Sequence, residues 1–326
     1  MKIIFTGVAG YIGSNLGKYL LEKGYEVVGV DDFNDFYSPK IKEFNISSFA
    51  DHPKFKLYRT DISDRASVEK VFQENIDAKA VVHLAAWAGV TQSVEQPYEY
   101  IVNNIVATGN LSDFCVKYGV NNFIFASTSS VYGDNPTPFE ESMDSSHSNA
   151  PYPATKKASE VLLYTEHLNH DLNVAIFRFF NPLGPNLRPD MALPKLIKSA
   201  EYGKTFELWI DPINSARDYT YINDMMTAVE TVINNPQKYE IMNLGNSNPI
   251  SLVDLIATVE KVTGKKVTTE EKYMPGQMKE TYANIDRARK IIGYDPHTSL
   301  EEMVKAYYEW FLQQPEWYRL DKLDEE

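Results

Sequence analysis

A glycine-rich turn near the beginning of the chain restricts what it can fold into. Gly7, Gly10 and Gly13 stand in the segment GVAGYIG, directly after the strand-like run KIIFT. Between a strand and a helix, glycine permits a tight turn, lets a diphosphate approach the backbone, and lets the helix pack closely on the strand. The positive end of the helix that follows favours an anion. The turn, with Tyr11 and Ile12 inside it, predicts a dinucleotide-binding βαβ unit.

Strand-like and helix-like segments alternate through the first half of the chain, which is typical of a parallel sheet. The predicted strands are KIIFT, YEVVGVD, FKLYRTD, AKAVVHLA, NFIFAST and NVAIFRFF. The predicted helices lie near residues 11–23, 64–75, 97–118 and 152–169. Six strands are the number found in the doubly wound dinucleotide-binding fold. We therefore predict the α/β class, with a Rossmann doubly wound parallel sheet.

The pattern becomes irregular after Asn181, where proline and glycine interrupt the segment NPLGPNLRPDM. The later segment RDYTYINDMMTAVETVI predicts a strand and a helix, and EIMNLGN predicts another strand that returns to the first lobe. We expect a Rossmann domain at residues 1–180 plus about 218–250. Residues 181–217 and 251–326 are expected to form a smaller C-terminal α/β lobe that binds the substrate.

Charge and composition disfavour several classes of partner. The formal net charge of −13 opposes general attraction to nucleic acids or anionic membranes. The sequence contains neither a signal-peptide pattern nor about 20 consecutive apolar residues. Its single cysteine, Cys115, suits a reducing compartment. The six histidines show no convincing metal-ligand pattern. We expect a cytoplasmic protein without a metal, a nucleic-acid partner or a membrane segment.

An acidic residue follows the second predicted strand at the spacing of a dinucleotide site. Asp31 lies eighteen residues beyond Gly13, where a carboxylate can accept hydrogen bonds from the adenosine ribose. Its charge would repel the 2′-phosphate of NADP, so NAD is the predicted cofactor. Asp32 is a rival for the same role, and Asn34 belongs to the same segment, DDFND. A simple turn built from these polar residues is the alternative.

A tyrosine and a lysine four residues apart form the predicted reacting pair. Tyr152 and Lys156, in YPATK, share one face of a helix. A lysine beside a tyrosine stabilises the phenolate, so the phenol becomes a usable base near neutral pH. The segment ASTSSVYG at 126–133 supplies hydroxyl groups that can orient a substrate oxygen. Such a pair is common on helices, and it gains weight here from the glycine turn upstream.

Together these motifs resemble the extended short-chain dehydrogenase/reductases of the NAD-dependent epimerase/dehydratase family, which act on nucleotide sugars. The resemblance covers nearly the whole chain and includes TDISD, HLAAWAGV, NNIVATGNL, SSVYG, YPATKKASE, RFFNPLGP and RDYTYINDM. It implies that Tyr152, Lys156 and Thr128 are catalytic. It further implies a cofactor site bordered by Asp61 and Ile62 at the adenine, and by Leu84, Ala85, Ala86, Ala88 and Asn104 along the cofactor path. It also suggests a homodimer formed by the helices near 97–118 and 152–169.

The residues after Thr128 favour one reaction within this family. Dehydratases and decarboxylases of the family carry an acidic residue there, whereas this chain has Ser129 and Ser130. The resemblance therefore implies a UDP-sugar 4-epimerase, which inverts C4 through a transient 4-keto sugar and a tightly held NAD. The alternatives are a nucleotide-sugar dehydrogenase or dehydratase, and a noncatalytic NAD-binding protein. The intact Tyr152, Lys156 and Thr128 argue against the last.

The substrate-binding residues leave the sugar undecided. Arg217 and Arg188 are candidates for a phosphate or a carboxylate, because guanidinium can bind either in bidentate fashion. The resemblance implies that Arg217 contacts the UDP diphosphate and that Asn181 faces the sugar and the phosphate. Trp87, a bulky aromatic beside the cofactor path, is a candidate for shaping the sugar pocket, and simple core packing is the alternative. UDP-glucuronate 4-epimerases are the most similar subfamily, but they usually carry Thr at position 181 and Arg at position 91. UDP-glucose and UDP-N-acetylglucosamine 4-epimerases therefore remain alternatives.

Overall fold

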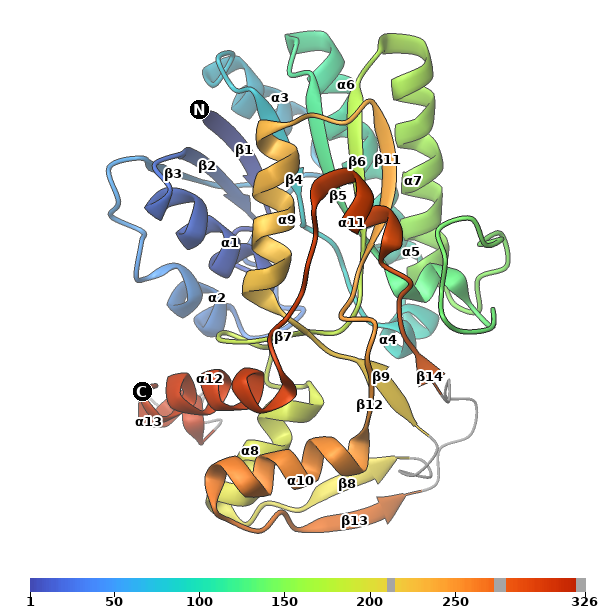
Figure 1. The fold of residues 1–326 in the computed structure, drawn as a ribbon. Coiled ribbons are helices and arrows are strands. Elements are labelled where there is room, and N and C mark those ends of the chain that lie inside the picture. Colours follow the sequence, from blue (N-terminus) through green and yellow to red (C-terminus); the bar gives the residue numbers. More distant parts are fainter. Residues whose placement is uncertain (210–214, 273–279, 321–326) are drawn as a thin grey trace. The chain divides into compact units, whose positions relative to one another are not determined.

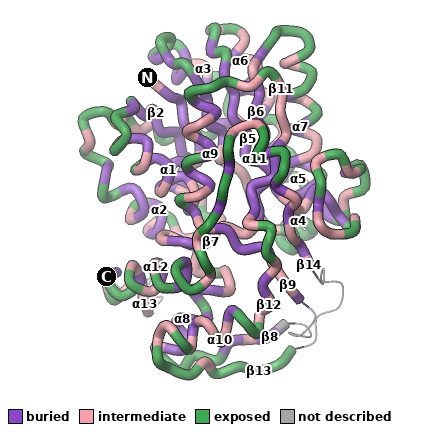
Figure 2. Tube along the Cα trace, viewed as in Figure 1, coloured by how far each residue is buried: buried purple, intermediate pink, exposed green. Residues whose placement is uncertain are grey.

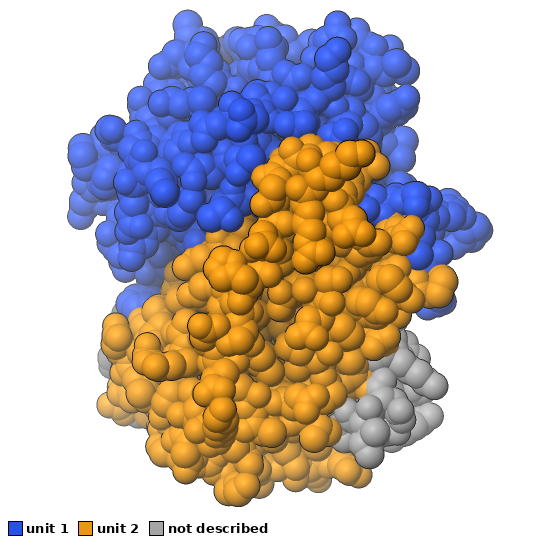
Figure 3. Space-filling model, in the orientation of Figure 1, with its two compact units in different colours: residues 1–135, 141–179, 226–243 blue, residues 136–140, 180–225, 244–326 orange. Residues whose placement is uncertain are grey.

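The computed structural model describes residues 1–209, 215–272 and 280–320 (Figure 1). The chain divides into two compact units, coloured separately in Figure 3. Unit 1 consists of residues 1–135, 141–179 and 226–243, and unit 2 of residues 136–140, 180–225 and 244–326. Unit 1 is therefore built from separate stretches of sequence.

A seven-stranded sheet forms the centre of unit 1, in the order β3-β2-β1-β4-β5-β6-β11. Its strands are β1 (Lys2–Thr6), β2 (Glu26–Asp31), β3 (Phe55–Arg59), β4 (Ala80–His83), β5 (Asn122–Thr128), β6 (Asn173–Phe179) and β11 (Tyr239–Leu244). The pairings from β3 across to β6 are parallel. The order reverses between β1 and β4, as in a doubly wound sheet. The predicted Rossmann fold class is confirmed.

Helices connect the parallel strands of unit 1. They are α1 (Tyr11–Glu22), α2 (Pro39–Ile46), α3 (Arg65–Glu74), α4 (Val90–Glu95), α5 (Pro97–Tyr100), α6 (Ala107–Tyr118), α7 (Pro151–His170) and α9 (Ile222–Asn234). The predicted helix at 97–118 contains a π-helical turn, η1 (Ile101–Val106), between α5 and α6. A short 3₁₀ helix, η2 (Ser129–Tyr132), follows β5. The sequence pattern did not predict α2 and α4, which have only eight and six residues and carry little helical periodicity.

The core of unit 1 is organised by strands whose side chains are buried on both faces. All residues of β4 and β5 are buried, because a parallel sheet between helices has no face open to water. Figure 2 shows the same concentration of buried positions along the central strands. Large apolar side chains from β5 and α6, such as Phe123, Phe125 and Phe114, contribute to one continuous cluster. This packing fixes the carboxyl ends of the strands, where the candidate site lies.

Unit 2 combines short strands with helices. It contains β7 (Pro182–Leu183), α8 (Ala192–Tyr202), β8 (Phe206–Trp209), β9 (Ala216–Asp218), β10 (Thr220–Tyr221), β12 (Pro249–Ser251), α10 (Leu252–Thr263), β13 (Thr269–Lys272), β14 (Glu280–Thr281), α11 (Asp286–Ile292), α12 (Leu300–Leu312) and α13 (Glu316–Arg319). A sheet of order β12-β9-β14 and a β13-β8 pair are its main strand assemblies. In the described part of the chain, none of the helices has the length and apolar character needed to cross a membrane.

A buried carboxylate fastens the segments around β9. Asp218 is fully buried and accepts hydrogen bonds from the backbone N–H groups of Asn246, Ser247 and Ala283, at 2.7, 3.0 and 3.0 Å. Backbone donors compensate the loss of water around a buried carboxylate. This arrangement holds β9, and therefore the neighbouring Arg217, in a fixed place within unit 2.

Candidate active site

The glycine turn after β1 leaves no room for a side chain at two of its positions. Gly7 has a φ of +75°, and a Cβ there would lie 2.6 Å from the backbone nitrogen of Ala85. A Cβ on Gly13 would overlap the carbonyl oxygen of Gly7. The Gly7 N–H donates to the carbonyl of Val30 at 2.8 Å, which joins the turn to the end of β2. The turn is therefore a backbone surface pressed against the β4 end of the sheet.

The beginning of α1 supplies N–H groups to this surface. Gly10 is the N-cap of α1 and has no side chain to cover the helix end. The first N–H groups of a helix point out of its N-terminal end, because no earlier turn of the helix supplies carbonyl acceptors for them. Such N–H groups and the helix dipole together favour an anion such as a diphosphate.

Asp31 ends β2 and braces the turn. Its carboxylate accepts hydrogen bonds from the backbone N–H groups of Ala9 and Phe33, both at 3.0 Å. Burial raises the pKa of Asp31, while the Phe33 N–H, the charge of Lys42 and the Ala9 N–H act in the opposite direction. A carboxylate has about four lone-pair positions. The two backbone N–H groups occupy two of these positions, so the carboxylate can still accept hydrogen bonds from the ribose hydroxyls that the sequence pattern predicts as its partners.

The other polar residues of this turn have different surroundings. Asp32 is exposed, and both of its oxygens accept from Asn34 Nδ2, at 2.8 and 2.9 Å. Lys42 Nζ donates to the carbonyl and to Oδ1 of Asn34, at 2.7 and 2.8 Å. Burial lowers the pKa of Lys42, and Asp31 and Asp32 oppose that change. Lys42 was missed at the sequence level, where only its position just after an acidic turn could have drawn attention to it.

The remaining cofactor candidates of unit 1 lie in the segments that follow β3 and β4. Asp61 accepts from the N–H and the hydroxyl of Ser63, at 2.7 and 2.9 Å, and the neighbouring Ile62 is buried. The Leu84 N–H donates to the Thr6 carbonyl at 3.2 Å, next to Gly7. Leu84 is followed by three further members of the predicted path, Ala85, Ala86 and Ala88. Ligands of open α/β sheets bind at this carboxyl edge.

Asn104 joins the β4 loop to α7. Its Oδ1 accepts from the Trp87 N–H at 2.9 Å, and its Nδ2 donates to the Trp87 carbonyl at 3.1 Å and to Thr155 Oγ1 at 2.9 Å. Asn104 lies in the π-helical turn and is buried. The Trp87 ring packs edge-on against Tyr100, with centroids 5.9 Å apart. Asn104 thus fixes the backbone on which Trp87 is carried.

A chain of buried hydrogen bonds runs beneath the site through His83. Thr6 Oγ1 lies 2.7 Å from His83 Nδ1, and His83 Nε2 lies 3.0 Å from Thr108 Oγ1. The Thr108 hydroxyl donates to the Asn104 carbonyl at 2.6 Å, so it accepts from His83 Nε2–H. His83 is then neutral, in agreement with burial and the nearby charge of Lys156, which hold its pKa well below the usual value. This histidine links β1 to the helices through both of its ring nitrogens.

The predicted reacting pair lies on α7. Lys156 is buried, and its Nζ is 4.3 Å from the centre of the Phe125 ring of β5. Burial lowers the pKa of Lys156 to about 7, against the raising effect of Glu160. The Tyr152 ring packs edge-on against Tyr100 at 6.1 Å. An amine with this pKa can change charge near neutrality, as acid–base groups do.

Thr128 ends β5 and begins η2. Its Oγ1 accepts from the Ser130 N–H at 3.2 Å and lies 3.2 Å from Ser130 Oγ. Ser129 lies between them and is partly exposed. The end of β5 therefore presents hydroxyl groups, and no carboxylate stands at positions 129 and 130 of the sequence.

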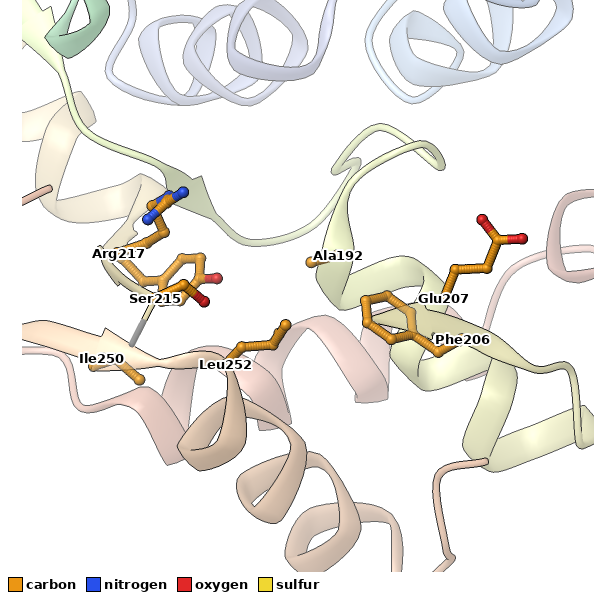
Figure 4. Close-up of a pocket in the computed structure, with 8 residues that line it drawn as sticks. Ala192, Phe206, Glu207, Ser215, Arg217, Ile250 and Leu252 are labelled. Carbon is orange, nitrogen blue, oxygen red and sulfur yellow. The ribbon is translucent and has the colours of Figure 1, made fainter. Parts of the chain in front are cut away.

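Unit 2 contains a pocket of about 160 Å³ beside β9. Its lining residues are Ala192, Phe206, Glu207, Ser215, Arg217, Tyr219, Ile250 and Leu252. Figure 4 shows the Arg217 guanidinium on one side of this space and the Phe206 ring on the other. Burial lowers the pKa of Arg217, although the group stays charged at neutral pH. The pocket combines apolar walls with one partly buried cation.

The other two substrate candidates of unit 2 do not line this pocket. Asn181 Nδ2 donates to the Asp218 carbonyl at 3.4 Å. Arg188 forms a bidentate ion pair with Asp190, with N–O distances of 3.0 and 2.6 Å. Within the described residues, no group of three or more His, Cys, Asp or Glu side chains could hold a metal ion.

These features define a dinucleotide-dependent enzyme. The glycine turn, the N-terminus of α1 and Asp31 all fit NAD. The chain belongs to the NAD dependent epimerase/dehydratase family, whose model matches residues 3–245. The family resemblance and the NAD cofactor predicted from the sequence are thereby confirmed.

Characterised relatives match almost the full chain. A UDP-glucuronate 4-epimerase of Thermodesulfobacterium geofontis is 37% identical over 309 residues, which is 94% of this chain and 95% of the relative. The structure of a UDP-glucuronic acid 4-epimerase from Bacillus cereus, with UDP-glucuronic acid and NAD, has a TM-score of 0.89 and 34% identity, covering 96% and 99% of the two chains. A Thermotoga maritima UDP-glucose 4-epimerase with UDP-glucose has a TM-score of 0.85 and 27% identity, with the same coverage.

Proposed function

We propose that this chain is an NAD-dependent UDP-sugar 4-epimerase and that UDP-glucuronate is its substrate. The observation that carries the proposal is the end of β5, where Thr128 is followed by Ser129 and Ser130 rather than by the acidic residues of the dehydratases and decarboxylases. The UDP-glucuronate 4-epimerases among the relatives support the same reaction and the same sugar.

The proposed chemistry assigns one role to each residue of the reacting set. Tyr152 takes the proton from the sugar 4-hydroxyl, and the Lys156 charge favours its phenolate. Thr128 hydrogen-bonds the same oxygen and orients it. NAD, when bound, supplies the hydride acceptor and donor at C4. After the sugar has presented its other face, Tyr152 returns the proton, so C4 is inverted without any net oxidation.

The pocket of unit 2 is the proposed site for the nucleotide. Arg217, which is partly buried in this pocket, would bind the diphosphate, because a guanidinium can match phosphate oxygens in bidentate geometry. Phe206, Ile250 and Leu252 would face the uridine with apolar surface. Asn181, Arg188 and Trp87 are the residues assigned to the sugar.

UDP-glucose, or UDP-N-acetylglucosamine, is the second candidate substrate. Asn181 and Thr91 favour it, since the UDP-glucuronate enzymes usually carry Thr and Arg there. Arg188 points the other way, because a retained arginine could bind a C6 carboxylate. Its bidentate pair with Asp190 means that a sugar carboxylate would compete with an existing partner.

The proposed assembly is a homodimer, and the proposed location is the cytoplasm. Val161, Tyr164 and Leu168 are 53%, 47% and 66% exposed and form one stripe on α7, at spacings of three and four residues. Tyr98, Ile101 and Val106, on the neighbouring α5 and η1, are also exposed. Clustered apolar side chains of this kind are typical of subunit interfaces. A second copy of this chain would cover them.

The decisive experiment is an NMR time course with UDP-glucuronate, UDP-glucose and UDP-N-acetylglucosamine in parallel, using the wild-type protein and Tyr152→Phe. Wild type should invert C4 of UDP-glucuronate. Tyr152→Phe should lose at least about 100-fold in rate, because a general acid–base group contributes that much, and should keep its NAD affinity. Tyr164→Phe, on the same helix but outside the site, is the matched control. Wild-type rates from Tyr152→Phe, or no inversion of any sugar, would contradict the proposal.

A further inference from the structure

A buried ion pair lies next to the reacting residues of unit 1. Arg178 Nε donates to Glu160 Oε1 at 3.0 Å, and one Arg178 Nη donates to Glu160 Oε2 at 2.7 Å. Both side chains are only 1% exposed. The Ser127 hydroxyl also donates to Glu160 Oε1, at 2.6 Å, and Lys157 Nζ lies 3.3 Å from Oε2. The Glu160 carboxylate is therefore saturated with donors from three elements of the fold.

The positions of these residues connect both parts of the reacting set. Glu160 lies four residues after Lys156 on α7, so the two side chains share one helix face. Ser127 immediately precedes Thr128 on β5. Arg178 comes from β6, the next strand of the sheet. One carboxylate thus ties the helix that carries the amine to the strand end that carries the hydroxyl.

Arg178 is held on its other side by aromatic and polar groups. Its guanidinium carbon lies 4.7 Å from the centre of the Tyr132 ring, and the Tyr132 hydroxyl donates to Asn243 Oδ1 at 2.6 Å. The Tyr132 ring therefore covers the side of Arg178 that does not face Glu160. Buried ion pairs add little stability compared with apolar residues of the same volume, because both charges lose their water. Stability alone therefore gives little reason for the Arg178–Glu160 pair.

We propose that Glu160 is a positioning residue for the catalytic pair, which holds Lys156 in its charged form and keeps the end of β5 against α7. This inference rests on the proposed function, because it assigns Glu160 to the reaction of Tyr152 and Lys156. Arg178 and Ser127 keep the carboxylate ionised and fixed, as multiple charge-assisted hydrogen bonds do.

The groups that face Lys156 make Glu160 the relevant charge. Tyr152 and Glu160 share α7 with Lys156, β5 contributes the Phe125 ring, and β4 contributes the neutral His83. Among the described residues, Glu160 is the charged group that favours protonation of Lys156. Arg178 and Lys157 face Glu160, and they lower the pKa of this carboxyl despite its burial.

The proposal predicts that substitutions of Glu160 and of Arg178 shift the titration midpoint of Lys156 in opposite directions. Glu160→Gln removes a negative charge and leaves Arg178 unbalanced, so the titration midpoint of Lys156 should fall by about one pH unit. Arg178→Met leaves an unbalanced carboxylate, so the midpoint should rise. The double variant Glu160→Gln/Arg178→Met restores local neutrality, and its shift should be smaller than that of either single variant.

The measurement is the pH titration of the Lys156 ammonium by NMR of the NAD-loaded, full-length protein labelled with ¹⁵N-lysine. Lys156→Arg assigns the signal, and Glu166→Gln, on the same helix but away from Lys156, is the matched control with no expected shift. The alkaline limb of kcat should move in parallel with each midpoint. If either Glu160→Gln or Arg178→Met does not fold, the direction in which the Lys156 midpoint shifts in the other variant tests the proposal.

The two proposals can fail separately. Equal midpoints in wild type, Glu160→Gln and Arg178→Met would overturn the role of Glu160, even if each variant lost stability, since a merely structural ion pair would change stability alone. Absence of C4 inversion by the wild-type protein would overturn the proposed function. The lysine titration does not depend on turnover and would still report on Glu160.

Discussion

Two glycines of unit 1 allow the cost of a left-handed backbone conformation to be measured separately from the cost of a steric clash. Gly7 and Gly119 both lie in unit 1 and have φ values of +75° and +71°. A Cβ on Gly119 would meet nothing within 4 Å, whereas a Cβ on Gly7 would lie 2.6 Å and 2.8 Å from two backbone atoms of Ala85. The variants Gly7→Ala and Gly119→Ala therefore share one unfavourable contribution and differ in the other.

The size of each contribution follows from these contacts. An alanine in the left-handed region costs about 1–2 kcal/mol, which applies to both variants. Gly7→Ala must also displace the Leu84–Ala85 backbone by several tenths of an ångström, since ordinary contact begins near 3.4 Å. Displacements of well-packed segments cost about a further 1–3 kcal/mol. We expect Gly119→Ala to lose about 1–2 kcal/mol of unfolding free energy and Gly7→Ala to lose about 2–5 kcal/mol.

Denaturant unfolding and calorimetric NAD titration would check both expectations. Gly119→Ala should bind NAD like the wild type, because its position at the end of α6 is remote from the turn. Gly7→Ala should bind NAD at least about tenfold more weakly, since a displaced turn loses hydrogen bonds worth about 1.4 kcal/mol or more. Equal stability and equal NAD affinity in the two variants would refute the argument that the Ala85 backbone restricts this turn.

Three further outcomes are expected. The Lys156 amine has a pKa of about 7 in the folded chain, against an ordinary value of 10.5. Protonation of this amine therefore favours the unfolded state. The stability of the folded chain that depends on the neutral amine is present above pH 10.5 and is lost as the pH falls through 7. Lys156→Met should therefore unfold at a higher temperature than the wild type at pH 6, with the gain vanishing near pH 10.5, while turnover is lost; a constant gain at all pH values would contradict this. Arg217→Met should weaken UDP binding at least about tenfold by calorimetry, because a charge-assisted hydrogen bond contributes about 1.5–3 kcal/mol, and should leave NAD affinity unchanged; undiminished UDP binding would exclude Arg217 from the diphosphate site. Leu168→Asp should convert a dimer to a monomer in analytical ultracentrifugation, with Leu312→Asp on α12 of unit 2 as the control; a Leu168→Asp dimer would exclude this face of α7.

The sheet of unit 1 was predictable because its information is local. Buried parallel strands such as β4 and β5 appear in the sequence as continuous apolar runs, and the glycine turn marks the first crossover. The spacing from Gly13 to Asp31 and from Tyr152 to Lys156 reflects helix and strand geometry, so it can be recognised without tertiary information.

The parts that escaped prediction depend on contacts between distant segments. The residues around Lys42 in the sequence do not indicate that its amine is buried against Asn34. The π-helical turn at Ile101–Val106 places Asn104 between Trp87 and α7, and a helical periodicity cannot show such an interruption. The link from His83 to Thr108 joins residues 25 positions apart. Each of these contacts joins segments that are separated in the sequence.

Because unit 1 is discontinuous in sequence, its sheet is completed late in the synthesis of the chain. Residues 226–243, which contain most of α9 and β11, complete a sheet whose other strands end at Phe179. During synthesis, β6 remains an edge strand while about 60 more residues are added, and its apolar run NVAIFRF has unpaired backbone groups. Until β11 is made, this edge can pair with other chains, and a fragment that ends near residue 180 would expose it permanently.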